Sequence, residues 1–253
     1  MYERVDWPWM LNGGSTLSMG WKPESGFLNA RWEHYCELMM IYLLAYGSPT
    51  HPLDPKTWHA WKRPTYTYDG ITYISSGDPL FTHQYSHAWY DFRGKRDAYA
   101  DYFDNSVKAT EAHKRWCITL RNKYQAYSKD LWGITSSDSE KEYVRWGGPP
   151  PVGPIDGSIV PCAAGGSLPF AFQDCMSVMR SLRSSYGNYV WKKYGPVDAF
   201  NPHNGWVNPD VIGIDLGITM LMAENARTGF VWKTFMKNPE AQTGMQKAGF
   251  KAP

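Results

Sequence analysis

Apolar residues recur at three- and four-residue intervals along most of the chain, which is the spacing of an α-helix. The pattern predicts about seven or eight helices, in the ranges 28–46, 79–94, 97–124, 172–186, 189–194, 211–226, 229–237 and 239–248. Strand signals are short, and the clearest is a small hairpin at 67–73 with Asp69 and Gly70 at its tip. Long loops rich in Trp, Gly, Pro and His join the helices. We therefore expect an all-α fold of the α/α toroid type, whose loops open onto one central cleft.

The range 79–94 has an unusual polar face for a surface helix. One side is apolar and carries Phe81, Tyr85, Ala88 and Phe92. The opposite side is polar but lacks Lys and Glu, and it carries His83, Gln84, His87 and Asp91. These side chains suit the lining of a cleft, and they equally suit a hydrogen-bonded ladder that only orients neighbouring helices. The spacing of the two imidazoles also permits a metal ion, although no Glu lies between them as in the zinc-protease pattern.

Two expected helical segments are apolar on nearly all sides, so other elements should cover them. They are 38–45, the second half of the first helix, and 211–226. Asp215 and Glu224 lie on opposite sides of the latter, so one of the two is expected to face a cleft. Glu224 can instead pair with Arg227 three residues further on.

Two glycine-rich loops are candidates for a functional site. In the loop 7–27, Glu24 follows Trp21, and a tight turn there would place the carboxyl against an indole, a setting that raises a carboxyl pKa for general-acid catalysis. The alternative is an ordinary acid in the first turn of a helix. The loop 147–170 is too rich in Gly and Pro for a helix. Its apolar residues favour a packed loop near a site over an interdomain linker.

Composition narrows the classes of function. The chain has 253 residues, enough for one large domain or two small ones. Its net charge is only +2 and its basic residues are scattered, which argues against nucleic-acid binding. The longest apolar run, 38–46, is too short to span a membrane. Aromatic residues make up 16% of the chain, a content that suits both a large core and stacking against sugar rings.

Several reactive side chains are predicted to be structural. Cys36 and Cys117 fall on apolar stripes, which indicates buried free thiols rather than a disulfide framework. His113 falls on the inward side of 97–124 and is expected to be a core histidine. The sequence shows no phosphate-binding glycine loop, nucleophile elbow or zinc signature, so we predict no cofactor and no metal.

Long phrases of the chain resemble one known family. The phrases are MLNGGSTLSMGWKPESGFL, LLAYGSPTHPL, DPLFTHQYSHAWYDFRG, NSVKAT, WGITSSD, RWGGPP, DGSIVPCAAGGSLPF, YGPVDAFNP and GIDLGITMLMAENARTGFVW. They resemble the bacterial glycoamylase-like family, which is related to the β-1,2-glucanases of glycoside hydrolase family 144 and has an (α/α)6 barrel. The resemblance covers residues 2–250 as a single domain. It implies a carbohydrate-active domain that cleaves a glucan, with β-1,2-glucan favoured.

The resemblance also implies functional residues. Glu24, in the GWKPESGF phrase, matches a carboxylate that similar enzymes place in the cleft and is the expected catalytic residue. The expected contacts with an oligo- or polysaccharide substrate are Trp21, His83, Gln84, His87, Asp91, Asp138, Asp156, Asp198 and Glu224. The sequence departs from the family pattern at Glu142, at Pro196 and at 172–174.

Similar proteins carry a further helical portion before the part equivalent to Tyr2, and they are often exported. We therefore expect an incomplete toroid that is inactive alone and associates through uncovered apolar faces at 38–45 and 211–222. Three functions are weighed. The first is glycoside hydrolysis by two carboxyl groups. The second is glucan binding without catalysis, and the third is metal-dependent hydrolysis at His83, His87 and Asp91.

Overall fold

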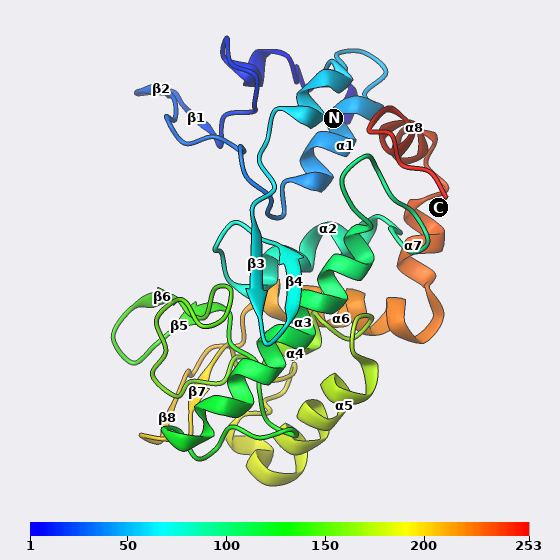
Figure 1. Ribbon diagram of the computed structural model, residues 1–253. Helices are drawn as coiled ribbons and strands as arrows, with labels where there is room; N and C mark the ends of the chain where they lie inside the picture. The colour runs from blue at the N-terminus through cyan, green and yellow to red at the C-terminus, as the bar shows by residue number, and fades with distance from the viewer. Residues whose placement is uncertain (253) are drawn as a thin grey trace.

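The computed structural model describes residues 1–252 and shows a helix-rich chain with short paired strands (Figure 1). The described residues form eight α-helices: α1 (Met39–Gly47), α2 (Tyr85–Trp89), α3 (Tyr102–Thr119), α4 (Pro161–Gly165), α5 (Phe172–Ser181), α6 (Gly213–Thr228), α7 (Phe230–Phe235) and α8 (Pro239–Lys247). They also form four separate antiparallel hairpins: β1 (Trp21–Lys22) with β2 (Gly26–Phe27), β3 (Thr65–Tyr68) with β4 (Ile71–Ile74), β5 (Ser136–Asp138) with β6 (Tyr143–Arg145), and β7 (Phe200–Asn201) with β8 (Trp206–Val207). The predicted helical class with short strands is confirmed.

Two large hydrophobic cores hold the described chain together, and a small third cluster of Tyr73, Ala109 and Ala112 joins β4 to α3. The first is built around α1 and includes the buried side chains of Leu43 and Trp58. The second lies among α2 to α6 and includes Trp132 and Met222. Phe103, near the start of α3, packs against both cores. Both chain ends lie beside the first core, close to α1 and α8 (Figure 1).

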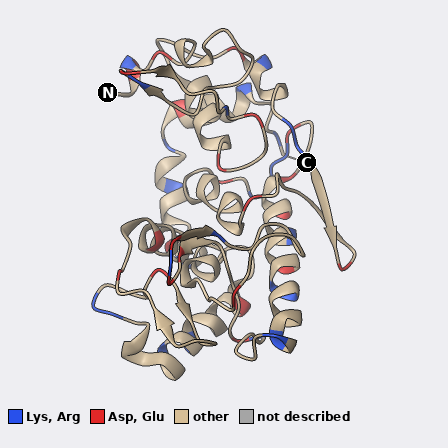
Figure 2. Ribbon diagram, turned by 90° about the vertical axis from the view of Figure 1, so that its left-hand side faces the viewer, with Lys and Arg blue, Asp and Glu red and all other residues tan. Residues whose placement is uncertain are grey.

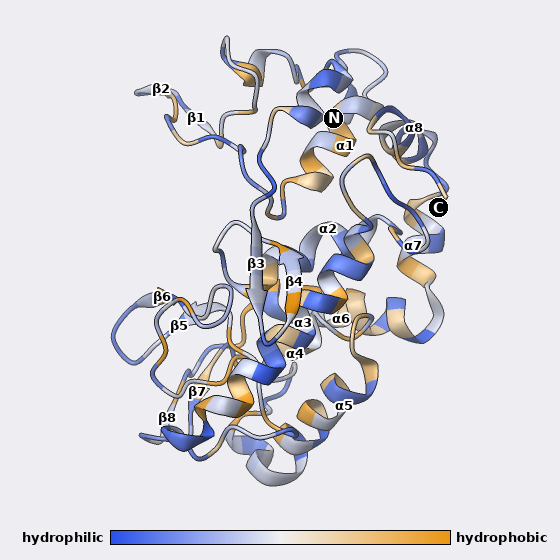
Figure 3. Cartoon of the chain, viewed as in Figure 1, coloured by the Kyte–Doolittle hydropathy of each residue, from blue (hydrophilic) through white to orange (hydrophobic). Residues whose placement is uncertain are grey.

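Helices α1 and α8 approach so closely that glycines are needed at their contact. A Cβ at Gly47 would collide with the Glu240 carbonyl, and a Cβ at Gly244 would collide with the Leu43 carbonyl. Figure 3 shows hydrophobic residues along much of α1, and most of its side chains are buried. The predicted cover of 38–45 is confirmed. The expectation that this segment lies uncovered on the flank of an incomplete fold is therefore wrong.

Helix α6 confirms the helix predicted at 211–226, and one of its apolar sides is open. Ile218 and Met222 are buried in the second core, whereas Ile214 is 62% and Met220 is 68% exposed. Residues 1–252 thus leave part of this apolar helix uncovered, as expected for 211–222.

The hairpin predicted at 67–73 is confirmed as β3 and β4. Tyr68 pairs with Ile71 across the turn. Asp69 and Gly70 have φ values of 48° and 75°. Positive φ at both central residues is the requirement of the tight turn that joins two twisted strands.

Helix α3 confirms the central part of the helix predicted at 97–124. Asp101 begins it, because its side chain accepts a hydrogen bond from the Asp104 N–H at 3.0 Å. His113 is buried, and its Nε2 accepts a hydrogen bond from the Ile134 N–H at 3.1 Å. The expectation of a satisfied core histidine at this position is confirmed.

The first half of the helix predicted at 28–46 does not form. Residues 28–38 are irregular, and their backbone pairs with other segments in bridges from Arg31 to Ser18 and from His34 to Lys62. These partners replace the hydrogen bonds of a helix, so only the fully apolar second half becomes α1.

The single helix predicted at 79–94 is also broken. A 3₁₀ turn at Leu80–His83 is followed by the short α2, and the chain becomes extended at Tyr90. Most of the predicted polar side is buried too, although Ala88 and Phe92 of the predicted apolar side are buried as expected. His83, Gln84 and His87 are buried, while Phe81 and Tyr85 are only partly buried.

The loop 147–170 packs into the second core, since residues 157–168 are all buried. This agrees with a packed loop rather than a linker. The loop contains α4, which the sequence did not predict; Pro161 fits its first turn, where a backbone N–H is not needed. The helix predicted at 189–194 is wrong, because the chain turns back there and Trp191 bridges Pro196.

Charged residues of both signs are interspersed along the ribbon (Figure 2). The four cysteines are free and buried, as predicted for Cys36 and Cys117. No helix in the described part of the chain is both long and apolar enough to cross a membrane.

Candidate active site

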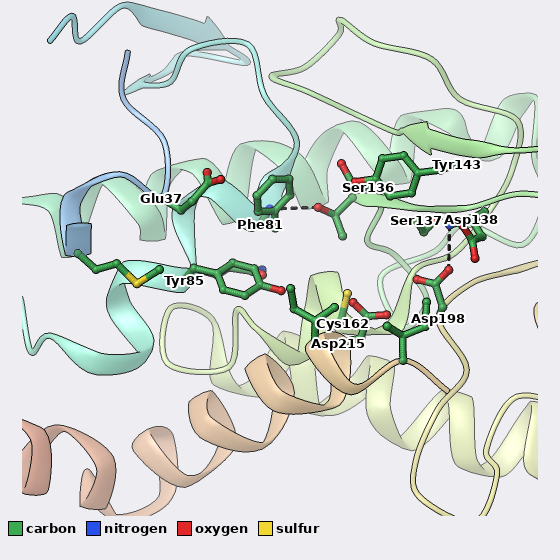
Figure 4. A pocket seen from close by; sticks show the side chains of 15 residues that line it. Glu37, Phe81, Tyr85, Ser136, Ser137, Asp138, Tyr143, Cys162, Asp198 and Asp215 are labelled. Carbon is green, nitrogen blue, oxygen red and sulfur yellow. Dashed lines mark hydrogen bonds between the residues drawn. The ribbon is translucent and has the colours of Figure 1, made fainter. Parts of the chain in front are cut away.

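A cavity of about 440 Å³ lies where segments from both cores meet (Figure 4). This volume is within the range of small-molecule sites. The residues before and in α1 supply Glu37 and Met40, and the turn before α2 supplies Phe81. The remaining walls come from α2, the β5–β6 hairpin, α4 and the residues before and within α6, with side chains that include Gln84, Tyr85, Ser136, Ser137, Asp138, Tyr143, Cys162, Asp198, Ile212, Ile214 and Asp215.

Asp198 and Asp215 form a pair of facing carboxyls at one end of the cavity. Asp215 is in the first turn of α6, where the helix dipole favours negative charge. Asp198 is buried, and its Oδ2 accepts hydrogen bonds from the Asp138 N–H at 2.9 Å and from the Asn208 Nδ2 at 3.0 Å. The two carboxyls are close enough to share a proton.

The environment of Asp215 favours its protonated form. Burial, followed by the hydrogen-bonded and negatively charged Asp198, raises the pKa of Asp215 to about 7. A hydrogen bond with Cys162 acts in the opposite direction. The Oδ2 of Asp215 is buried and has no hydrogen-bond partner among residues 1–252. Asp215 can therefore carry a proton near neutral pH and present it in the cavity.

Asp198 is the member of the pair that is better able to hold the negative charge. Burial raises the pKa of Asp198 as well, but the hydrogen bonds that it accepts from Asp138 and Asn208 lower it. Donors aimed at a carboxylate stabilise its charged form. The shared proton is thus expected to reside mainly on Asp215.

Glu37 is the acid on the opposite wall of the cavity (Figure 4). It directly precedes α1, and burial raises the pKa of its carboxyl. The Tyr85 ring lies between the two walls. Burial, followed by the charges of Cys162, Asp215 and Glu37, raises the pKa of its hydroxyl. The cavity therefore combines carboxyls on two sides with an aromatic wall, a combination typical of sugar-binding clefts.

The structure brings three of the sequence-predicted site residues to the cavity: Gln84, Asp138 and Asp198. The Nε2 of Gln84 donates to the Ala163 carbonyl at 2.9 Å and to the Ser167 hydroxyl at 2.8 Å. Its Oε1 is buried without a hydrogen-bond partner in the described residues.

His83 and His87 lie in the protein interior and do not line the cavity. The Nδ1 of His83 lies 3.1 Å from the Tyr35 hydroxyl, and the Nε2 of His87 lies 3.0 Å from the Ser106 hydroxyl. Burial lowers the pKa of both imidazoles to about 3, so both are neutral. Of the alternatives left open by the sequence, their contacts fit hydrogen-bonded orientation of neighbouring elements.

Three predicted acidic residues lie outside the cavity and have local partners. Asp91 pairs with Arg93 at 2.8 Å, and Glu224 pairs with Arg227 at 2.9 Å. Asp156 accepts a hydrogen bond from the backbone N–H two residues further on. Of the two acids on opposite sides of α6, Asp215 is the one that faces the cavity.

Trp21 and Glu24 also lie outside the cavity, on the β1–β2 hairpin. Trp21 is 46% exposed, and its ring centroid lies 5.9 Å from that of Trp9. Glu24 is exposed in the turn between the two strands. The turn beside an indole is present as predicted, but its carboxyl is not buried against the ring.

Glu37 was absent from the sequence-predicted site, and Asp215 was considered only as one of two cleft candidates. The sequence contains a signal for each of these two acids. Both are single acids inside otherwise apolar runs, CELMMIY and VIGIDLGITM, where a carboxyl is costly to bury unless its environment or function accounts for it. Within residues 1–252, no three His, Cys, Asp or Glu side chains are placed to hold a metal ion.

Glycoside hydrolases act through a pair of carboxyl groups at one cleft, and this cavity likewise gathers carboxyls from several segments of a helical scaffold. The family model described as "Putative glucoamylase" matches residues 29–239, and the chain belongs to this glycoamylase family.

Solved relatives share the fold over the whole chain. An endo-β-1,2-glucanase from Chitinophaga pinensis, in complex with sophorotriose and glucose, is 32% identical with a TM-score of 0.94 over 100% of this chain and 63% of its own. A putative glucoamylase from Bacteroides uniformis is also 32% identical, with a TM-score of 0.93 over the same shares. An exo β-1,2-glucooligosaccharide sophorohydrolase (non-reducing end) from Parabacteroides distasonis is 29% identical over 98% of this chain and 38% of its own length. The chain thus spans less than two thirds of the length of these relatives.

Proposed function

We propose that this chain is the carboxyl-bearing part of a glycoside hydrolase that cleaves a β-1,2-glucan. The observation that carries the proposal is Asp215, an acid whose pKa is raised to about 7 in a cavity with Glu37 on its opposite wall. The β-1,2 linkage is supported by the names of the Chitinophaga and Parabacteroides relatives.

The proposed reaction begins with Asp215 as general acid. Glycoside hydrolysis needs one carboxyl that protonates the leaving oxygen and a second that activates water or attacks the anomeric carbon. Asp215 donates its proton to the glycosidic oxygen, and the resulting carboxylate is stabilised by the Cys162 hydrogen bond and the start of α6. Asp198 maintains the high pKa of this acid because its own charge opposes ionisation of Asp215.

Glu37 is the proposed second carboxyl, because it faces the same cavity from the other wall. Glu24 is the alternative, on the strength of the GWKPESGF phrase, and it would serve only if the β1–β2 hairpin met the substrate bound in the cavity. Gln84 and Asp138 are proposed contacts for sugar hydroxyls. Trp21, Asp91, Asp156 and Glu224 lie outside the cavity, so contacts from them would require an extended glucan. His83 and His87 are buried and are not proposed as contacts.

We propose the (α/α)6 toroid as the fold of the full catalytic unit, with residues 2–250 as one domain within it. The shared packing of Phe103 between the two cores supports a single domain. The TM-score of 0.94 to a longer β-1,2-glucanase supports a place within a larger scaffold.

The test is the release of reducing ends from β-1,2-glucan and from sophoro-oligosaccharides. Asp215→Asn keeps the size of the side chain but removes the acid, and it should lower kcat by about 10²–10⁴-fold while sparing binding. For the unchanged chain, kcat/KM should fall as pH rises above about 7, because Asp215 loses its proton there. Equal rates for the chain and for Asp215→Asn would contradict the proposed acid.

A non-catalytic glucan-binding domain is the second candidate, and the exposed Trp21 and its neighbour Trp9 favour it. In that case the chain would retain β-1,2-glucan in affinity electrophoresis and release no reducing ends. The hydrolase is preferred because binding alone gives no reason for an acid held near pKa 7.

A further inference from the structure

The β5–β6 hairpin carries an aromatic side chain at the mouth of the cavity. Tyr143 lines the cavity and is 62% exposed. The other two aromatic residues that line the cavity, Phe81 and Tyr85, are less exposed than Tyr143. No other aromatic ring packs against Tyr143 in the described part of the chain. One face of a large ring is thus available beside the cavity (Figure 4).

Tyr143 and Asp138 are directly opposite each other in the hairpin register. Side chains of such a pair lie on the same face, close enough to contact one ligand together. Both line the cavity. The hairpin therefore presents a flat apolar surface next to a hydrogen-bond acceptor.

The pair is held in place by the turn of the hairpin and by Asn208, which follows β8. The Ser139 hydroxyl accepts a hydrogen bond from the Glu142 N–H at 3.1 Å and donates to its carbonyl at 2.6 Å, which closes the turn. The Nδ2 of Asn208 donates to the Asp138 Oδ2 at 3.2 Å. The Asp138 Oδ1 takes part in no hydrogen bond among residues 1–252, so it is available to a ligand.

We propose that Tyr143 and Asp138 form a binding position for one glucosyl residue at the mouth of the cavity. The C–H groups of a β-glucosyl ring make one of its faces apolar, and that face stacks on Tyr143. A hydroxyl at the ring edge donates to the Asp138 carboxylate. The proposal rests on the proposed function only for the identity of the ligand as a glucan.

Asp198 adjoins this position, because its Oδ2 accepts the Asp138 N–H at 2.9 Å, and it lies deeper than Tyr143, because it is buried. A glucan anchored at the mouth therefore extends from Tyr143 toward the Asp198–Asp215 pair. The binding position at Tyr143 therefore determines how the glucan enters the cavity, and Asp215, the proposed acid, lies deeper in the cavity.

The experiment measures binding in the Asp215→Asn background, so that hydrolysis does not interfere. Sophoro-, laminari-, cello- and malto-oligosaccharides are titrated by calorimetry against this variant alone and with Tyr143→Ala, Tyr143→Phe or Tyr189→Ala. Tyr189 is the matched control, because it is 65% exposed but does not line the cavity. We expect Tyr143→Ala to weaken binding about tenfold, or about 1.4 kcal/mol, with Tyr143→Phe and Tyr189→Ala close to unchanged.

The outcomes separate this position from the proposed function. Hydrolysis by the unchanged chain together with equal affinities for Tyr143→Ala and its parent overturns the binding position and leaves the hydrolase intact. Binding that depends on Tyr143 without hydrolysis by the unchanged chain supports the position and overturns the hydrolase. Equal losses in Tyr143→Ala and Tyr189→Ala, or no binding of any oligosaccharide, overturn the binding position.

Discussion

The side-chain amide of Asn208 connects two of the cavity carboxyls: its Nδ2 donates to Asp138 at 3.2 Å and to Asp198 at 3.0 Å. Asn208 is itself buried. A donor aimed at Asp198 stabilises its charged form. Because Asp198 and Asp215 share one site, Asn208 thereby helps to keep the proton on Asp215.

Replacement of Asn208 should alter the pH profile of hydrolysis. Without its donor, Asp198 ionises less readily, so the form of the pair with the charge on Asp198 and the proton on Asp215, which the proposed reaction uses, arises at higher pH. In Asn208→Ala the acid limb of kcat/KM should therefore move to higher pH. Asn204→Ala is the control, since that side chain bonds Glu140 and the Trp206 N–H and contacts neither Asp138 nor Asp198 through a hydrogen bond. If the maximal kcat/KM falls but both limbs of the pH profile stay at the same pH, Asn208 has only a structural role.

The raised pKa of Asp215 predicts a pH dependence of stability. The unfolded group ionises near its ordinary value of 3.8, whereas the folded group keeps its proton up to about 7. The contribution of Asp215 to the free energy of unfolding is therefore complete below about pH 4. It falls as the pH rises from about 4 to about 7, and it stays constant at higher pH. Asp215→Asn removes this loss, so its Tm should exceed that of the unchanged chain at about pH 8. The difference should shrink toward pH 4 in thermal scans, and a constant difference would argue against the raised pKa.

The identity of the second carboxyl can be tested with two matched substitutions. If Glu37 acts from the cavity wall, Glu37→Gln should lower kcat by about 10²–10⁴-fold, and Glu24→Gln should retain most activity. If the carboxyl in the β1–β2 turn reaches the substrate, the effects reverse. Binding in both variants should persist, because the amide keeps the size of the side chain. Initial rates on sophoro-oligosaccharides distinguish the two cases.

The exposed indole of the β1–β2 hairpin should contribute to glucan binding rather than to folding. Trp21 is 46% exposed and contacts the equally exposed Trp9, so Trp21→Ala should weaken retention on glucan. The thermal transition should stay nearly in place, because neither core includes this ring. Trp58→Ala, which removes a buried core ring, should instead lower the Tm strongly. A collapse of the fold in Trp21→Ala would show that the ring is structural.

Features that depend on neighbouring residues could be predicted from the sequence alone. The hairpin at 67–73 forms as expected, because Asp69 and Gly70 accept the positive φ values of its turn. The pairing of Glu224 with Arg227 follows from helical spacing. Helices α3 and α6 form where long apolar periodicity predicts them, since that pattern gives each a face to bury.

Only the tertiary structure decided which side chains meet. Residues 28–38 and 79–94 have helical periodicity, but distant backbone partners and a break before α2 replaced the expected helices. His83 and His87 point inward, where the Tyr35 and Ser106 hydroxyls each lie within hydrogen-bond distance of one ring nitrogen. The Nδ1 of His87 has no hydrogen-bond partner among residues 1–252. Periodicity defines two faces of a helix, but it does not say which face the rest of the protein covers.

In the candidate site, too, the tertiary structure decided which residues come together. Its acids come from before α1, from β5, from the loop before β7 and from α6, and no local pattern links them. The sequence alone established that Asp215 and Glu37 are single acids in apolar runs. The raised pKa of Asp215 arises from burial and from Asp198, because desolvation and a neighbouring charge act through space and not along the chain.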